Sequence, residues 1–191
     1  MKLISMIILI IIVFISCSKK DDEKDNTTSE LEGTWSSVCY ASGSYYLIDS
    51  IIVSGTNFAI KEEHHDDSNC NTDNATVVYN FSGLSIKDAV VTFTSGATGH
   101  DFSVNVSNVK ATLQNSSEVS YTNTNNGCGF SDWALNTEKD ITGKTCGSTT
   151  YPPANVTLLG LYKLVGNNLN IATFSTTSYP SSVNSITYIK Q

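Results

Sequence analysis

Short apolar runs that alternate with polar residues fill most of this chain, and this pattern constrains the fold most strongly. Apolar and polar residues alternate along these runs, as they do in a half-buried strand. The apolar residues do not recur at helical spacing. Turns rich in Asn and Gly separate the runs. The pattern predicts an all-β fold with strands at residues 34–40, 45–53, 58–64, 75–81, 89–94, 102–113, 118–122, 133–136, 156–165, 169–174 and 185–189.

Two hairpins stand out in this pattern. The first joins residues 47–53 to 58–60 through Ser-Gly-Thr-Asn, and the second joins 158–165 to 169–172 through Gly-Asn-Asn. Consecutive antiparallel strands of this kind form an up-and-down barrel or a β-sandwich. We favour the barrel, with the sandwich as the second choice, because closure removes the exposed strand edges that promote aggregation.

The first residues of the chain are predicted to form an export signal. Residues 3–15 contain only one polar residue, Ser5. This apolar run is too short to span a bilayer, which needs about 20 residues, but it has the length of a signal-peptide core. Phe14-Ile15-Ser16-Cys17 follows and resembles the lipobox of bacterial lipoproteins. The resemblance implies that residues 1–16 are removed and that Cys17 carries the lipid that anchors the protein to a membrane. The alternative is an ordinary secretory signal.

Residues 17–30 are predicted to form a disordered tether, because residues 18–30 include no apolar residue that could offset the entropy of ordering. Lys19-Lys20-Asp21-Asp22-Glu23 resembles the stretch that directs lipoproteins of Bacteroidetes to the cell surface, although a solvated linker has the same composition. The expected location is therefore the periplasm or the cell surface, at the outer membrane. Residues 31–191 are long enough for a single β domain.

The charge of the chain argues against two classes of partner. All 11 basic residues are lysine, and the formal net charge is −7. Nucleic acids and anionic lipid surfaces are recognised by Lys/Arg patches, and arginine is the residue suited to bidentate phosphate contacts. We therefore expect no nucleic-acid partner.

Four cysteines lie in the domain, in addition to Cys17. An even number in an exported chain predicts disulfides, and zinc is the competing explanation. Structural zinc sites use cysteines in close pairs, whereas each of these is isolated in the sequence. Short loops close more readily and a meander places neighbouring strands side by side, so we expect Cys39 to pair with Cys70 and Cys128 with Cys146.

Leu31-Glu32-Gly33-Thr34-Trp35 resembles the first strand of lipocalin-like barrels. The order of Trp35, Cys39, the first hairpin and Cys70 is similar to small disulfide-bearing, lipocalin-like domains of secreted bacterial lipoproteins, an uncharacterised group whose second half is similar to the stretch from Cys128 onward. The resemblance implies a single antiparallel lipocalin-like barrel in which Trp35 closes the floor.

No motif indicates an enzyme. The sequence has no Gly-x-Ser-x-Gly elbow, no H-E-x-x-H and no glycine-rich phosphate loop. Residues 62–67, Glu-Glu-His-His-Asp-Asp, are the only dense titratable cluster. If Phe58 and Ile60 face the core, Glu62 and His64 share that face and are a plausible ligand set for a divalent ion. A solvated strand end has the same composition, and we expect no metal or other cofactor.

Many aromatic residues fall at alternating positions inside the expected strands. Barrels of this size are either filled by such side chains or hold one small ligand among them. The leading hypothesis is a membrane-anchored binding protein that holds a small apolar molecule or lipid, with Trp35 and Phe58 as ligand contacts. The alternative is a structural or surface-interaction lipoprotein with a filled barrel.

Overall fold

The computed structural model describes residues 30–95 and 97–191. The predicted signal peptide, Cys17 and all of the tether except Glu30 lie outside the described residues. The strands and helices, in chain order, are β1 (Gly33–Ser36), β2 (Tyr40–Ser42), β3 (Tyr45–Ser54), β4 (Asn57–His65), β5 (Asp73–Thr92), β6 (Thr98–Leu113), α1 (Ser116–Thr124), the 3₁₀ turn η1 (Gly127–Gly129), β7 (Glu138–Asp140), β8 (Thr145–Cys146), β9 (Thr149–Thr150), β10 (Thr157–Val165), β11 (Asn168–Ile171) and β12 (Tyr188–Lys190).

Both hairpins predicted from the sequence are confirmed. In the first, Ser54 of β3 pairs with Asn57 of β4, so the loop is two residues long. In the second, Val165 of β10 pairs with Asn168 of β11. Gly55 and Gly166 start these loops with positive φ angles of 58°, a conformation that glycine adopts without steric cost. The turn chemistry therefore sets the register of both strand pairs.

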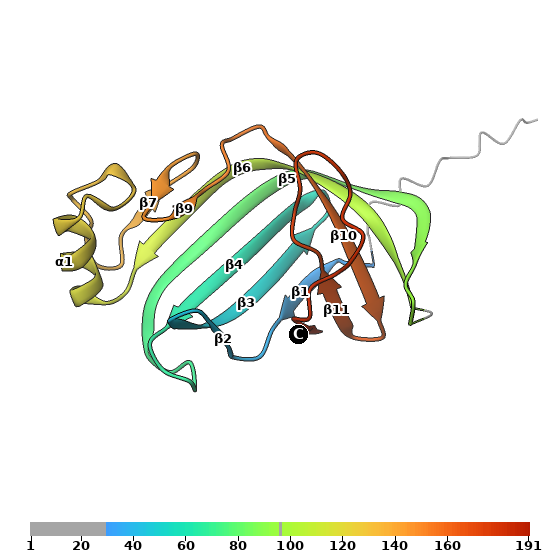
Figure 1. Cartoon of the computed structure of the whole chain (residues 1–191), viewed down its shortest axis with the longest axis horizontal. Helices are drawn as coiled ribbons and strands as arrows, with labels where there is room; N and C mark the ends of the chain where they lie inside the picture. The colour runs from blue at the N-terminus through green and yellow to red at the C-terminus, as the bar shows by residue number, and fades with distance from the viewer. Residues whose placement is uncertain (1–29, 96) are drawn as a thin grey trace, which may run out of the picture.

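One sheet of ten strands contains a closed ring (Figure 1). Its eight members pair in the order β1-β12-β11-β10-β6-β5-β4-β3, and β1 closes the ring by also pairing with β3. Every pairing is antiparallel, so the predicted all-β antiparallel class is confirmed, and the ring is barrel-like. The described residues do not form the β-sandwich that was the second choice, because one sheet contains all the strands of the ring.

The ring departs from a simple meander at β6. Strands β3 to β6 pair consecutively, but β6 then pairs with β10, and the segment carrying α1, η1 and β7 to β9 is inserted between them. This segment lies at one end of the long strands, and β1, β10 and β11 lie at the other (Figure 1). The inserted segment therefore covers one end of the sheet, which positions the site described below.

Two expected strands are wrong. Residues 118–122 belong to α1, and residues 133–136 form no strand. Asn115 begins the helix because its side chain accepts a hydrogen bond of 2.9 Å from the Ser117 N–H, which satisfies one of the free donors of the first turn. Trp133 is fixed by Asn123, whose side chain bonds both its N–H and its carbonyl oxygen. In both segments the short alternating pattern predicted a strand, but helix capping at Asn115 and tertiary packing at Trp133 determined the structure.

Aromatic side chains fill the interior toward β10 and β11. Phe58, Phe81 and Phe102 come from neighbouring strands of the ring, and Phe174 packs onto all three from the segment after β11. Tyr162 of β10 contacts Phe102 on the other side. This part of the ring is a packed hydrophobic core.

Both predicted disulfides are confirmed. Cys39 bonds Cys70 across a Cα–Cα distance of 5.9 Å and joins the segment before β2 to the loop between β4 and β5. Cys128 bonds Cys146 across 4.2 Å and joins η1 to β8. Disulfides persist in oxidising compartments, so the pairing indicates an extracytoplasmic location. In the described part of the chain, no helix has the length and apolar character needed to cross a bilayer.

Candidate functional site

A pocket of about 460 Å³ lies where the inserted segment covers the ends of β4, β5 and β6. We call it the end pocket. Strand alternation places apolar side chains of β5 and β6 on its floor, and α1, η1 and β8 form the opposite wall. Its lining residues are Tyr45, His64, Asn74, Ala75, Val77, Ala111, Leu113, Glu118, Tyr121, Thr122, Asn125, Gly127, Cys128, Trp133, Ile141, Cys146, Gly147, Ser148 and Tyr151.

The end pocket has an apolar interior and a polar mouth. Val77, Leu113, Trp133 and Ile141 are all buried. The Trp133 indole N–H donates to the Gly127 carbonyl at 3.0 Å, so the ring is held in place with its only polar atom satisfied. Around the mouth, the side chains of α1 include the exposed Tyr121. Such a lining suits a ligand with an apolar body.

A second set of inward-facing side chains lies beside the end pocket. We call it the acid–tyrosine cluster. Asp49 of β3 pairs in register with Glu62 of β4, so both point to the same side of the sheet. His64 follows two residues later on that same side and also lines the end pocket. The cluster consists of Tyr40, Asp49, Glu62, His64, Tyr79, Tyr151 and Tyr188.

Asp49 is the most deeply buried member of the cluster, with 5% of its surface exposed. Its Oδ2 accepts hydrogen bonds from the hydroxyls of Tyr40, at 2.5 Å, and Tyr188, at 3.4 Å. Its Oδ1 is also buried and has no hydrogen-bond partner in the described part of the chain. Burial raises the pKa of Asp49, and the Tyr40 hydrogen bond acts in the opposite direction.

Glu62 and His64 lie closer to the pocket and are about a quarter exposed, at 29% and 26%. Glu62 Oε2 is 3.7 Å from His64 Nε2 and accepts a long hydrogen bond of 3.4 Å from the Tyr79 hydroxyl. The Tyr79 ring lies 6.0 Å from that of Tyr151. Burial, and then the nearby Glu62, raise the pKa values of Tyr79 and Tyr151, so both hydroxyls keep their protons and can donate.

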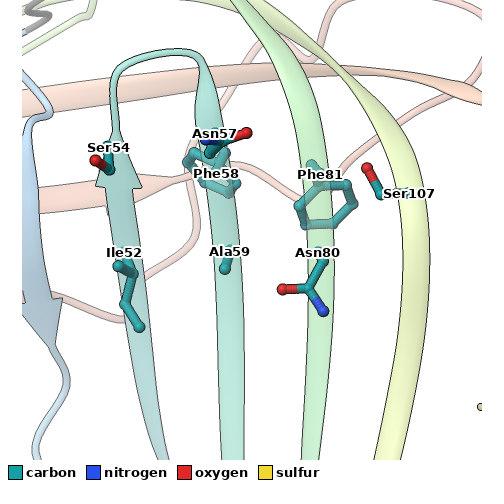
Figure 2. Close-up of a pocket in the computed structure, with 8 residues that line it drawn as sticks. All are labelled: Ile52, Ser54, Asn57, Phe58, Ala59, Asn80, Phe81 and Ser107. Atoms are coloured by element: carbon teal, nitrogen blue, oxygen red, sulfur yellow. The ribbon is translucent and has the colours of Figure 1, made fainter.

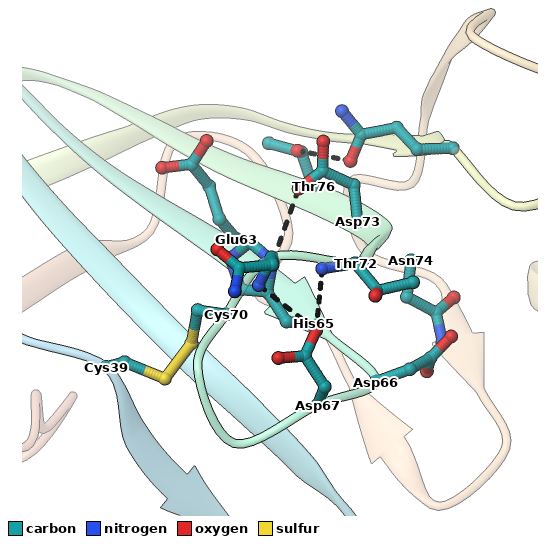
Figure 3. A network of polar contacts seen from close by, with 12 residues as sticks. Cys39, Glu63, His65, Asp66, Asp67, Cys70, Thr72, Asp73, Asn74 and Thr76 are labelled. Carbon is teal, nitrogen blue, oxygen red and sulfur yellow. Dashed lines mark hydrogen bonds and ion pairs between the residues drawn. A yellow bond between two sulfur atoms is a disulfide. The ribbon is translucent and has the colours of Figure 1, made fainter.

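The structure divides the titratable run at residues 62–67. Glu62 and His64 join the cluster, whereas Glu63 forms an ion pair of 2.6 Å with Lys61. His65 lies beside Asp73, with its Nδ1 3.2 Å from Oδ1. Asp67 accepts hydrogen bonds from backbone N–H groups of the β4–β5 loop, and Asp66 accepts one from the side-chain amide of Asn74 on β5 (Figure 3). Within residues 30–95 and 97–191, no three His, Cys, Asp or Glu side chains are arranged to hold a metal ion.

Trp35 and Phe58, the ligand contacts expected from the sequence, lie in the packed core. Each is 1% exposed, and neither lines the end pocket. Trp35 donates its indole N–H to the Leu31 carbonyl at 2.8 Å, and Phe58 packs among the core phenylalanines. Phe58 also borders a shallow depression of about 230 Å³ across β3 to β6, where Ile52 is exposed (Figure 2).

Sequence reasoning missed Asp49 as a site residue, although a signal was present. In the run Leu47, Asp49, Ile51, Val53 every second residue faces the interior, and Asp49 is the only polar one among them. A carboxyl group at an inward position of a strand marks a place where burial is costly unless it has a partner. Tyr40 and Tyr188 carried no such signal, because only the pairing of distant strands brings them to Asp49.

Neither the models of known protein families nor the curated proteins include a match to this chain. The class of protein therefore follows from the chain's own structure: an all-β, barrel-like domain with two disulfides and an interior pocket at one end.

Proposed function

We propose that this protein is a membrane-anchored, extracytoplasmic binding protein that holds a small molecule with an apolar body in the end pocket. The pocket itself carries the proposal. Its volume of about 460 Å³ falls within the usual range for small-molecule sites, roughly 300–1,000 Å³. Four buried lining residues, Val77, Leu113, Trp133 and Ile141, supply an apolar surface, and the mouth of the pocket is polar.

The energetics favour a ligand of modest size. Enclosing on the order of 300 Å² of apolar ligand surface contributes roughly 7 kcal/mol at 25 cal/mol per Å². The cost of association reduces this gain, so micromolar binding is the expected range. The ligand lies at the α1 end of the sheet, because phenylalanines fill the other end.

The anchor in this proposal is the lipid on Cys17, and the location is the periplasm or the cell surface. Two disulfides support the extracytoplasmic part of this assignment. The Ser16-Cys17 sequence after a short apolar run supports the lipid. The tether in residues 17–30 would let the domain reach away from the membrane.

A structural or surface-interaction lipoprotein without a ligand is the second candidate. The packed aromatic core favours it, because the part of the ring that contains Trp35 and Phe58 has no room for a guest molecule. The two candidates differ in one observable property, which is whether the end pocket takes up a ligand.

The two tryptophans provide the test, since Trp133 lines the end pocket and Trp35 does not. Residues 18–191 retain the whole hydrophobic core and both disulfides and lack the lipid cysteine. We would titrate this chain with the neutral apolar dye N-phenyl-1-naphthylamine. The Trp35→Phe variant should show quenching of Trp133 and energy transfer to the dye. The Trp133→Phe variant should show a much smaller response from Trp35.

Ala111→Phe, which places a ring in the pocket, should weaken dye binding by at least about tenfold. Ala59→Phe is the matched control, because Ala59 borders the outer depression and not the pocket. Dye binding no tighter than about millimolar in the parent chain would favour the ligand-free candidate. Loss of binding only in Ala59→Phe would move the site to the outer depression.

A further inference from the structure

The interior beside the end pocket is acidic, and no lysine of residues 30–95 and 97–191 forms an ion pair with its carboxyl groups. Asp49 and Glu62 are cross-strand neighbours on the inner face. In the described part of the chain, the lysines that form ion pairs do so with Glu63, Glu138 and Asp132. None pairs with Asp49 or Glu62, and the only potentially basic group beside them is His64. Two carboxyl groups therefore share a partly buried space in which, among the described residues, only a protonated His64 would offer a compensating charge.

Asp49 has one buried oxygen atom whose hydrogen-bonding capacity is unused by the described residues. A carboxyl group that is 95% buried normally has both oxygens bonded, because an unpartnered buried acceptor costs free energy. Tyr40 and Tyr188 bond Oδ2, but Oδ1 has no partner in residues 30–95 and 97–191, although its residue is only 5% exposed. The Nε2 atom of His64, which lines the end pocket, is likewise buried without a hydrogen bond.

The surrounding tyrosines have the chemistry of a site for an organic cation. Tyr40, Tyr79, Tyr151 and Tyr188 surround the two carboxyl groups. Aromatic ring faces attract an ammonium group, and tyrosine hydroxyls accept its hydrogen bonds. Burial and the neighbouring carboxyl groups raise the pKa values of Tyr40, Tyr79 and Tyr188, so these side chains stay neutral and add no charge of their own. No metal-ligand arrangement is present among the described residues.

We infer that the acid–tyrosine cluster binds the protonated amine of a small amphiphilic amine. This inference rests on the proposed function and names its ligand class. His64 and Tyr151 belong to the cluster and also line the end pocket, so the two regions are continuous. The ammonium group lies against Asp49 and Glu62, and the apolar body of the ligand lies on Val77, Leu113 and Trp133.

The test compares ligands of one shape and different charge. Residues 18–191 are titrated by calorimetry at pH 7.5 with 2-phenylethylamine, its neutral counterpart 2-phenylethanol, and the anion 3-phenylpropionate. We expect the amine to bind at least about tenfold more tightly than the alcohol, which corresponds to 1.4 kcal/mol, and the anion to bind most weakly.

Two variants test the residues. Asp49→Asn and Glu62→Gln should each weaken amine binding by about tenfold or more and weaken alcohol binding by much less, because the alcohol carries no charge. The second variant keeps the test valid if Asp49→Asn fails to fold, because Glu62 is less buried and its replacement should have little effect on folding. Glu63→Gln is the matched control: it neighbours Glu62 on β4 but pairs with Lys61, and it should not affect binding.

The outcomes distinguish failure of the amine inference from failure of the proposed small-molecule binding. If amine and alcohol bind equally while N-phenyl-1-naphthylamine still binds, the pocket stands and the amine inference is wrong. If the amine binds tightly but neither variant weakens it, the cation lies elsewhere and the inference is also wrong. If the dye and all three phenyl compounds fail to bind, the proposed function is rejected together with it.

Discussion

Gly160 allows β10 to pass directly across the ring of Phe102. The two residues are paired in register, and a Cβ atom at position 160 would lie 2.4 Å from the Phe102 Cζ atom. Phe102 is fully buried among other aromatic rings and has little room to move. Overpacking of this kind typically costs about 1–3 kcal/mol.

We therefore expect Gly160→Ala to lower the free energy of unfolding by about 1–3 kcal/mol, measured by urea denaturation. Phe102→Leu should cost less in the Gly160→Ala background than alone, since the smaller side chain makes space for the new methyl group. If the double variant shows only the sum of the two single costs, the clash is not what destabilises Gly160→Ala.

Asp49 illustrates what a buried carboxyl group costs the fold. Its pKa is raised by burial, so its folded-state pKa lies above the unfolded value of 3.8. A raised pKa gives stability that is present at pH values below the unfolded pKa and is lost as the pH rises through the folded pKa. At neutral pH the ionised carboxylate thus destabilises the fold relative to the acid form.

Asp49→Asn should for this reason raise the thermal unfolding midpoint at pH 7.5, because the amide is neutral and its oxygen can still accept from Tyr40 and Tyr188. The gain should shrink as the pH is lowered through the raised folded-state pKa, where the folded carboxyl group regains its proton, toward the unfolded value of 3.8. A midpoint that falls at pH 7.5 would contradict this account of the site.

The loop between β4 and β5 is the element that the first disulfide stabilises (Figure 3). Asp67 accepts hydrogen bonds from the N–H groups of Asn69, Asn71 and Thr72, and its bonds with Thr72 contribute most to lowering the pKa of this carboxyl group. Cys70 has a positive φ of 53°, which a residue other than glycine adopts only when its surroundings hold it there. The loop is thus fixed from within by Asp67 and from outside by Cys39.

Replacing both Cys39 and Cys70 by serine should lower the free energy of unfolding by about 3–4 kcal/mol, because the bridge spans 31 residues and closes a long loop in the unfolded chain. The Cys128→Ser, Cys146→Ser pair is the comparison. Its span of 18 residues predicts a loss that is smaller by about half a kcal/mol. Urea denaturation of residues 18–191 measures both, and an unchanged midpoint in the first variant would argue against the bridge.

For the whole molecule, the arrangement we propose has a membrane anchor, a tether and a domain. The domain's ring leaves β1 paired on both sides, with β3 and β12, so the first and last strands protect each other. Lys190 of β12 lies over the Trp35 ring at 5.0 Å, which adds a contact at this closure. The end pocket lies at the opposite end of the long strands.

Anchoring through Cys17 predicts that a palmitate analogue fed to the producing bacterium labels the protein and does not label Cys17→Ser. The wild type should sediment with membranes, and the variant should be released. The Cys39→Ser, Cys70→Ser variant controls for general effects of cysteine loss, and it should still be labelled. Equal labelling of wild type and Cys17→Ser would end the lipoprotein proposal.

The sequence by itself determined the local features of this protein. Alternating apolar residues defined β3, β4, β10 and β11, and Gly55 and Gly166 defined the two hairpin turns, because strand period and turn geometry depend only on neighbouring residues. The even cysteine count and short spacings identified both disulfides. A strand was wrongly expected at residues 118–122, since a short run fits strand and helix alike and Asn115 decides between them.

Only the tertiary structure decided where the interior is filled and where it is open. Trp35 and Phe58 were expected beside a ligand, but the segment after β11 brings Phe174 onto that core, and the inserted α1 segment creates the pocket at the other end. Tyr188 reaches Asp49 across 139 residues of sequence. No local pattern encodes such contacts, because the two partners lie far apart in the sequence and meet only when the chain folds and the ring of strands closes.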